Sequence, residues 1–302
     1  MVQIAAILTV HNRREKTLSC LRHLFAAVAA CDAVPLSLSV FLTDDGCSDG
    51  TADAVQTTFA DKDIRITKGT GSLFWAGGMR LAWQAAIDTG TAWDYFLLLN
   101  DDTFVHNNVF SQLFEAMTHG FHQSGRHGLV SGITCQPGCP EKITYGGFLF
   151  TGKEKGLHKL AQPTGKPQTV DMTHANILLV HSDVVNNCGI FYHGYVHSCA
   201  DLDYSMTASS KGFPVMVTAS VCGECECDHD TNKDEAVILM TMTLAERKHY
   251  AENPTHSDHD YLLYVSRNLP KRYPMAWLLR KIRIYAPRIY YYITNSRGVY
   301  KL

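Results

Sequence analysis

Long apolar runs are missing from this sequence of 302 residues. No run approaches the roughly 20 residues that a membrane-spanning helix needs. The start also lacks the basic segment and apolar core of a secretory signal peptide, because the short apolar run Met1–Val10 stops at His11-Asn12-Arg13-Arg14. Since disulfides form mainly in oxidising compartments, we expect the ten cysteines to be mostly reduced and buried. Together these absences predict a cytoplasmic protein.

Acidic residues are absent from the last part of the chain. Residues 268–302 contain eight Lys or Arg and no Asp or Glu, which leaves 19 basic against 29 acidic residues in 1–267. The same segment holds six tyrosines and Trp277. Basic residues mixed with aromatic ones are typical of a helix in a membrane interface, although such a segment could also pack on the acidic body or contact nucleic acid. We favour peripheral attachment of 268–302 to the inner face of the cell membrane, with no nucleic acid partner.

The order of the hydrophobic patterns predicts the fold class. In the first half, short apolar runs alternate with amphipathic segments, as in a parallel sheet with crossover helices. From about residue 236 the pattern is helical, so we predict two domains, 1–240 and 241–302, the second being a helical extension. The expected strands are 4–10, 38–43, 64–67, 95–99, 129–134, 143–150, 177–181 and 213–220; the expected helices include 17–30, 108–117, 183–188 and 201–210, with an exposed loop over 152–167.

Three of the expected strands end in polar residues. These strand ends are Thr9–Arg13, Asp44–Gly50 and Asn100–Thr103. In open α/β sheets, ligands bind beyond the carboxyl ends of the strands. An acidic residue there could simply cap the next helix, but two acidic strand ends would repel each other unless a cation or a donor-rich ligand lies between them. The pattern therefore indicates a binding site at this edge of the sheet.

Four segments of the chain stand out, namely Asp44–Thr51, Gly71–Arg80, Leu97–Thr103 and His197–Tyr204. Together they resemble glycosyltransferase family 2. They occur in the order of that family and span roughly residues 3–230. The resemblance implies the GT-A fold, an α/β domain with a mixed, mostly parallel sheet flanked by helices, here followed by a helical C-terminal extension. Asp44–Thr51 is similar to the family's Asp-Asp-Gly-Ser-x-Asp-Gly-Thr motif, with Cys47 inserted, and Gly71–Arg80 is similar to the donor loop of its rhamnosyltransferase-like members. Leu97–Thr103 is similar to a variant of its Asp-x-Asp motif, and His197–Tyr204 is similar to its acidic catalytic segment.

The resemblance implies a nucleotide pocket at the first two strand ends. Asp44, with Asp45 as the second choice, would accept a hydrogen bond from the base, and Asn100 would lie near the ribose. The donor would be a nucleoside diphosphate sugar. The other residues implied for the pocket are Thr9, Asn12 and Arg13.

The resemblance also implies a diphosphate and metal site. Asp102 would bind Mg²⁺ or Mn²⁺ between the two phosphates, with Asp101 as a supporting residue. One or two carboxylates suffice for such a cation when phosphates supply the remaining ligands. Gly77 and Gly78 would belong to the donor loop, and Arg80 would add a second positive charge, the alternative for Arg80 being a solvated helix residue.

Asp201 matches the catalytic base of the family. It would take the proton from an acceptor hydroxyl as that oxygen attacks the anomeric carbon from the opposite face, which inverts the stereochemistry. The sequence departs from the family pattern at two positions, with Ala200 where Glu is common and Thr207 where Arg is expected. These departures leave the base in place but change its surroundings.

A cysteine-rich segment allows two interpretations. Cys222, Cys225 and Cys227, followed by His229, could ligate zinc together with Cys135 and Cys139. The family resemblance instead implies that His229 is an additional ligand of the metal or the diphosphate.

The sequence thus predicts an inverting, metal-dependent glycosyltransferase that acts on a glycan or lipid-linked glycan in surface polysaccharide synthesis. One alternative is a catalytically inactive module that binds a nucleotide sugar or a glycan, which the departures at Ala200 and Thr207 would suit. Another is a sugar nucleotidyltransferase, but the glycine-rich loop expected after its first strand is replaced here by Asn12-Arg13-Arg14.

Overall fold

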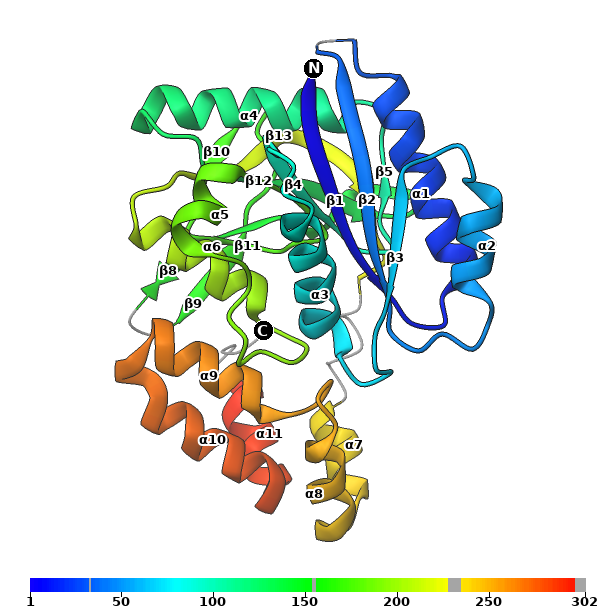
Figure 1. Cartoon of the computed structure of the whole chain (residues 1–302). Coiled ribbons are helices and arrows are strands. Elements are labelled where there is room, and N and C mark those ends of the chain that lie inside the picture. Colours follow the sequence, from blue (N-terminus) through cyan, green and yellow to red (C-terminus); the bar gives the residue numbers. More distant parts are fainter. Residues whose placement is uncertain (33, 154–155, 228–234, 297–302) are drawn as a thin grey trace.

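A computed structural model gives the structure of the chain and describes residues 1–32, 34–153, 156–227 and 235–296 (Figure 1). Its centre is a large mixed sheet with the strand order β10-β13-β6-β12-β4-β1-β2-β3, to which β5 and β7 are added at β13 and β6. The strands are β1 (Val2–Val10), β2 (Leu36–Asp44), β3 (Ile64–Lys68), β4 (Tyr95–Leu99), β5 (Phe104–Val105), β6 (Leu129–Gln136), β7 (Cys139–Tyr145), β10 (Gln168–Thr169), β12 (Ile177–His181) and β13 (Val215–Glu224).

Four parallel strands bring the predicted polar strand ends to one edge. β1 pairs in parallel with β2 and β4, and β2 pairs in parallel with β3. β12 runs antiparallel to β4, with Ile177 opposite Leu99, so β12 begins where β4 ends. The segment before β12 therefore reaches the same edge as the residues that follow β4.

Two apolar clusters cover the two faces of the sheet. Ile4, Ala6 and Leu8 of β1 pack in one cluster, whereas Ala5 and Ile7 pack in the other. This double burial is typical of parallel strands and explains why β1 is apolar at successive positions. Helices α1 (Arg14–Ala29), α2 (Thr51–Thr58) and α4 (Val109–Ser124) contribute to the first cluster, and α3 (Phe74–Asp88), α5 (Ser182–Cys188) and α6 (Ala200–Ser210) to the second.

A second, three-stranded sheet corrects two expectations. The predicted strand 143–150 is two strands, because the chain leaves β7 at Gly146 and enters β8 (Gly147–Gly152) in the other sheet. The predicted exposed loop 152–167 contains β9 (Leu157–Leu160), which pairs with β8. A short strand, β11 (Met172–Thr173), completes this sheet. The break between β7 and β8 and the strand β9 were not predicted, because the apolar stretches in this part of the sequence are short and interrupted by Lys and Gly.

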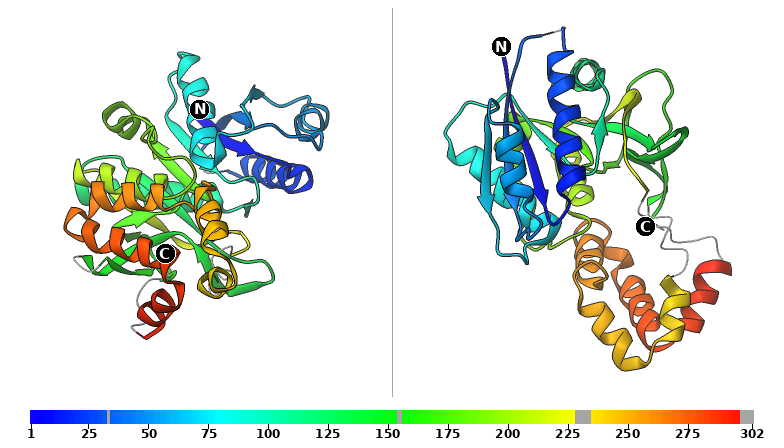
Figure 2. Two further views of the ribbon diagram at one scale, coloured as in Figure 1. Left: turned by 90° about the horizontal axis from the view of Figure 1, so that it is seen from below. Right: turned by 90° about the vertical axis from the view of Figure 1, so that its right-hand side faces the viewer.

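The C-terminal extension is helical, as predicted. Figures 1 and 2 show it beyond the carboxyl ends of β1 and β2. It packs on the domain through α9, which contacts α6. Of the described helices, none has both the length and the apolar character to cross a membrane. The extension consists of α7 (Glu235–Thr241), α8 (Leu244–Glu252), α9 (Asp258–Asn268), a 3-10 turn at Pro270–Arg272, α10 (Tyr273–Tyr285) and α11 (Pro287–Ser296).

Candidate active site

The loops after β1 and β2 are joined by polar contacts. The Nδ1 atom of His11 lies 2.7 Å from the carbonyl oxygen of Asp45, and the Oδ1 atom of Asn12 accepts a hydrogen bond from the N–H of Ser48 at 2.8 Å. Asn12 has a φ of 52°, a left-handed conformation that asparagine tolerates better than most residues. The two predicted strand ends therefore form one connected surface.

Asp44 and Asp45 have different surroundings. The carboxylate of Asp45 accepts three backbone hydrogen bonds from the donor-loop segment, from Gly71 at 2.7 Å, Leu73 at 2.9 Å and Phe74 at 3.1 Å. Asp45 thus fixes the start of α3. Asp44 accepts one bond in its own turn, from the N–H of Cys47 at 2.8 Å.

The predicted glycines Gly77 and Gly78 lie buried inside α3 rather than in a loop. A Cβ atom at Gly78 would lie 2.8 Å from the Cβ of Thr9, so glycine allows α3 to approach β1 closely. The carbonyl oxygen of Gly78 also accepts a hydrogen bond from the hydroxyl of Thr43 at 2.8 Å. In this structure Thr9 and Gly78 form a packing contact beside the strand ends.

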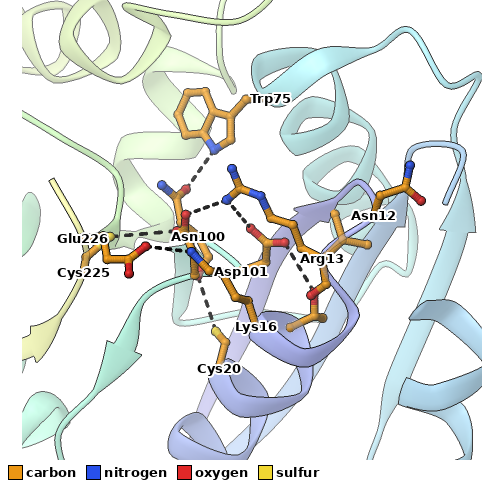
Figure 3. Close-up of polar contacts among 12 residues, drawn as sticks. Asn12, Arg13, Lys16, Cys20, Trp75, Asn100, Asp101, Cys225 and Glu226 are labelled. Atoms are coloured by element: carbon orange, nitrogen blue, oxygen red, sulfur yellow. Dashed lines mark hydrogen bonds and ion pairs between the residues drawn. The ribbon is translucent and has the colours of Figure 1, made fainter. Parts of the chain in front are cut away.

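Asp101 and Asp102 share the guanidinium group of Arg13. Figure 3 shows Arg13 beside Asp101. The Nη1 atom of Arg13 lies 2.5 Å from Oδ2 of Asp102 and 3.5 Å from Oδ1 of Asp101. Asp101 is buried and also accepts a hydrogen bond from Thr17 at 3.3 Å. Burial raises the pKa of Asp101 to about 7, against the opposing effect of the Arg13 charge. The side chain of Asp102 is 15% exposed, against 8% for that of Asp101, so Asp102 is the more accessible carboxylate.

Asn100 connects this pair to the aromatic wall of the site. Its Oδ1 atom accepts a hydrogen bond from the indole N–H of Trp75 at 2.8 Å, as Figure 3 shows. The Trp75 ring lies 5.5 Å from the ring of Phe191. The hydrogen bond to Asn100 places Trp75 at the site, and the Trp75 side chain is also partly buried against the apolar core.

Asp201 lies in the first turn of α6, and its carboxylate is oriented by backbone groups. Oδ2 accepts a hydrogen bond from the N–H of Ala175 at 3.0 Å, and Oδ1 accepts one from the N–H of Leu202 at 2.9 Å. Burial raises the pKa of Asp201 to about 6, while these hydrogen bonds act in the opposite direction. Asn176, which follows Ala175 in the chain, accepts a hydrogen bond at its carbonyl oxygen from the N–H of Asn100 at 3.2 Å. Residues 175–176 thus bring Asp201 close to the end of β4.

Arg80 contacts protein carbonyl groups. Its Nη1 atom donates to the carbonyl oxygens of Tyr195 at 2.7 Å and Tyr192 at 3.3 Å. The side chain is half-buried, and this burial lowers the pKa of Arg80. In this structure Arg80 therefore supports the loop that precedes α6.

No group of three or more His, Cys, Asp or Glu residues with the geometry of a metal site occurs among the described residues. Cys222 is buried and donates to the carbonyl oxygen of Ser220, and Cys225 donates to Asp102 at 3.9 Å and accepts from Asn176 at 3.5 Å. The zinc interpretation gains no support from these contacts. His229, the other predicted metal ligand, lies outside the described residues.

Sequence reasoning did not predict two ion pairs. The pairing of Arg13 with Asp102 joins residues 89 positions apart. The pairing of Asp203 with Arg267 joins α6 to α9, with Nε of Arg267 at 2.9 Å from the carboxylate. For Asp203, the available signal was an acidic residue in a helical first turn, which favoured a local contact with the helix dipole.

Comparisons with known proteins bear on the family and on the fold. Residues 5–136 match the family model described as glycosyl transferase family 2. A search of curated proteins gave no match. Among solved structures, the fold is similar to a mannosyltransferase from Pyrobaculum calidifontis in complex with GDP-Man and Mn²⁺, with 12% identity, a TM-score of 0.52 and coverage of 99% of this chain and 81% of that one. It is also similar to residues 1–349 of TarS from S. aureus, with 11% identity, a TM-score of 0.51 and coverage of 100% and 93%.

At these identities the structural similarity concerns the fold, and it confirms the predicted GT-A architecture with its mixed, mostly parallel sheet and flanking helices. The family match covers the strand ends that carry Asn12, Asp44 and Asp102. The similarity to glycosyl transferase family 2 therefore rests on residues 5–136, the part of the chain that holds these strand ends.

Proposed function

We propose that this chain is an inverting glycosyltransferase that moves a sugar from a nucleoside diphosphate sugar to a hydroxyl group of a glycan acceptor. The observation that carries the proposal is the link through residues 175–176. Ala175 donates to the carboxylate of Asp201, and Asn176 accepts from the backbone of Asn100. A carboxylate that can act as a base therefore lies beside the strand end that carries Asp101 and Asp102.

The donor nucleotide would lie over the ends of β1 and β2. Asn12 and Arg13 line this edge, and Asn100 lies on its other side. Asp44 is the better candidate to accept from the base, because the carboxylate of Asp45 already accepts three backbone hydrogen bonds and that of Asp44 accepts one. Thr9, Gly77, Gly78 and Arg80 would act by holding α3 against β1 and the loop before α6.

The donor set around Asp102 suits a hard divalent cation. Asp101 and Asp102 supply carboxylate oxygens, and Mg²⁺ or Mn²⁺ usually needs only one or two of these when phosphates provide the rest. Asp102 would hold the cation with Asp101 in support, and the cation would supply positive charge for the leaving diphosphate. The guanidinium group of Arg13 adds positive charge from the protein itself, since it already lies against Asp102.

Asp201 would act as the general base. Its two backbone donors hold the carboxylate in one orientation, and a pKa of about 6 leaves it mostly ionised at neutral pH while making it more basic than an ordinary aspartate. It accepts the proton of the acceptor hydroxyl as that oxygen bonds to the anomeric carbon. The bond from this carbon to the diphosphate oxygen breaks on the opposite face, so the configuration inverts.

Thermal melts and transfer assays on the chain of 302 residues, with UDP-, GDP- and dTDP-sugars and Mn²⁺, test this proposal. We expect one donor class to raise the melting temperature, since a true ligand stabilises by mass action. Asp201→Asn should keep this stabilisation and lose transfer, and NMR of the wild-type product should show an inverted anomeric centre. Donor binding without any turnover by the wild type would favour a binding module instead, and a retained configuration would contradict the mechanism.

The surface of the extension supports a lipid-linked acceptor and peripheral binding to an anionic membrane. Large apolar side chains of α10 and α11 are exposed, and no acidic residue occurs in 268–302. Basic side chains lie among them, so the surface could insert rings between headgroups while its cations meet anionic lipid. The exposed apolar residues are Met275, Trp277, Leu278, Ile289 and Tyr292, and the exposed basic ones are Lys271, Lys281 and Arg288.

A further inference from the structure

A carboxylate from the extension holds the loop that precedes Asp201. Asp260 is the third residue of α9 and is only 1% exposed. Its Oδ2 atom accepts hydrogen bonds from the N–H groups of His197 at 2.7 Å and Ser198 at 2.8 Å. Both of its oxygens also lie 3.2 Å from the N–H of Val196. Three consecutive N–H groups therefore point at one carboxylate, and charge-assisted bonds of this kind are stronger than neutral ones.

The same loop is held on its other side by α3. The carbonyl oxygen of Val196 accepts a hydrogen bond from the N–H of Ala76 at 3.2 Å. The guanidinium group of Arg80 donates to the carbonyl oxygen of Tyr195. The positively charged Arg80 thus binds a carbonyl group of the loop, and the negatively charged Asp260 binds N–H groups of the same loop. The loop backbone is therefore held by contacts from two different helices.

The loop leads directly into the start of α6. Cys199 is the N-cap residue of α6 and has a φ of 62°. This left-handed conformation is uncommon for a residue other than glycine and persists only where its surroundings hold it. The hydrogen bonds of Asp260 end at Ser198, one residue before Cys199, and Asp201 follows two residues after it.

We propose that Asp260 is a positioning residue for glycosyl transfer. By holding the N–H groups of residues 196–198, it fixes the backbone that starts α6 and so the carboxylate of Asp201. The inference rests on the proposed function of Asp201 as the base. A second contact supports it, because Asp203 of α6 accepts hydrogen bonds from Arg267 at 2.9 Å and Asn268 at 2.6 Å. The extension is therefore part of the framework of the active site.

The substitution Asp260→Asn tests this role, because it keeps the side-chain shape while removing the charge and replacing one acceptor with a donor. We expect kcat to fall about tenfold to a hundredfold, since small displacements of a catalytic group have effects of this size. The donor KM should stay unchanged, because the nucleotide edge is built by other elements. Hydrogen–deuterium exchange of the amides of 196–198 should become faster.

Asp258→Asn is the matched control on the same helix. Asp258 pairs within the extension, with Arg283 at 3.1 Å and Arg280 at 3.6 Å. Its loss should lower the melting temperature but leave kcat and exchange at 196–198 as in the wild type. If Asp260→Asn does not fold, Asp260→Ser takes its place with the same measurements.

Wild-type kcat and wild-type exchange in the Asp260 variant would overturn the inference. Equal losses in the Asp260 and Asp258 variants would also overturn it, because the effect would then reflect the stability of the extension. If the wild-type protein transfers no sugar, the proposed function is contradicted instead. The wild-type assay shows this before any variant is compared.

Discussion

Two buried carboxylates at the site, Asp101 and Asp201, differ in what surrounds them. Both have a raised pKa because of burial. Asp101 has the charge of Arg13 and the hydroxyl of Thr17 beside it, whereas Asp201 is oriented by two backbone N–H groups. A carboxylate beside a cation is suited to a charge network. Asp201 has no cationic partner among the residues that the structure describes, so it is suited to accept a proton. This difference supports the proposed division of roles.

The pKa of Asp201 predicts the pH dependence of transfer. A general base must be deprotonated, and the folded protein holds this carboxylate at a pKa of about 6. We expect kcat to be constant at neutral pH and to fall as the pH decreases through about 6, rather than through the ordinary aspartate value of about 4. Steady-state rates from pH 5 to 8 measure this limb, with nucleotide binding followed over the same range as the control. A rate independent of pH over that range would argue against Asp201 as the base.

Arg13 provides a second prediction at the scale of one residue. Arg13→Gln removes the positive charge beside Asp102, so we expect a loss of transfer of about tenfold to a hundredfold from weaker stabilisation of the diphosphate. Because the Arg13 side chain is 47% exposed, unfolding stability should change by less than about 1 kcal/mol. Kinetic assays and thermal melts measure the two effects.

The neighbouring Arg14 supplies the control for that experiment. Its guanidinium group pairs only at 3.8 Å with the exposed Glu15, so Arg14→Gln should leave both activity and stability near the wild-type values. Equal kinetic effects of the two substitutions would contradict the role assigned to Arg13.

At the scale of elements, the longer apolar strands at the centre of the large sheet were predicted well, whereas the short buried strand β11 was not predicted. The predicted ranges 95–99 and 177–181 match β4 and β12 at both ends, because each is a short apolar run bounded by polar residues. The glycine pair was misleading in one respect. Gly77 and Gly78 suggested a loop, whereas Asp45 binds the N–H groups of Gly71, Leu73 and Phe74 and thereby starts α3 before the glycines. A helix start fixed by a distant carboxylate has no local sequence signal.

Gly78 and Gly77 provide a matched pair of substitutions within α3. A Cβ at Gly78 would lie 2.8 Å from the Cβ of Thr9 on β1, so Gly78→Ala should destabilise the fold by about 1–3 kcal/mol through overpacking. The atoms nearest to a Cβ at Gly77 would be side-chain atoms of Leu73, at 3.2 Å, and of Arg80, at 3.7 Å. Since alanine favours helix by about 1 kcal/mol over glycine, Gly77→Ala should be close to neutral or stabilising. Urea unfolding of both variants measures the difference, and equal effects would contradict the proposed close approach of α3 to β1.

At the scale of the whole molecule, the sequence predicted the fold and the order of the site segments but not how the extension joins them. The polar strand ends were visible because parallel topology brings them to one edge. The contacts of Asp260 with residues 196–198 join positions more than 60 apart, and those of Asp203 with α9 are equally distant. Hydrogen bonds from a carboxylate to backbone N–H groups impose no residue type on the partner segment, so no sequence pattern records them.

The extension also carries the last prediction, which concerns membrane binding. If the exposed surface of α10 and α11 meets anionic lipid, each basic residue near the surface contributes about 1 kcal/mol of attraction. Replacing Lys281 and Arg288 by Glu should then weaken binding to phosphatidylserine vesicles by at least about 2 kcal/mol, or about thirtyfold. Replacing the exposed Arg22 and Lys166 of the GT-A domain by Glu changes the net charge equally and should leave binding unchanged. Vesicle flotation at low and high salt measures both variants. Equal flotation of the two would mean that net charge alone drives binding, and no flotation of the wild type would contradict a membrane role for this surface.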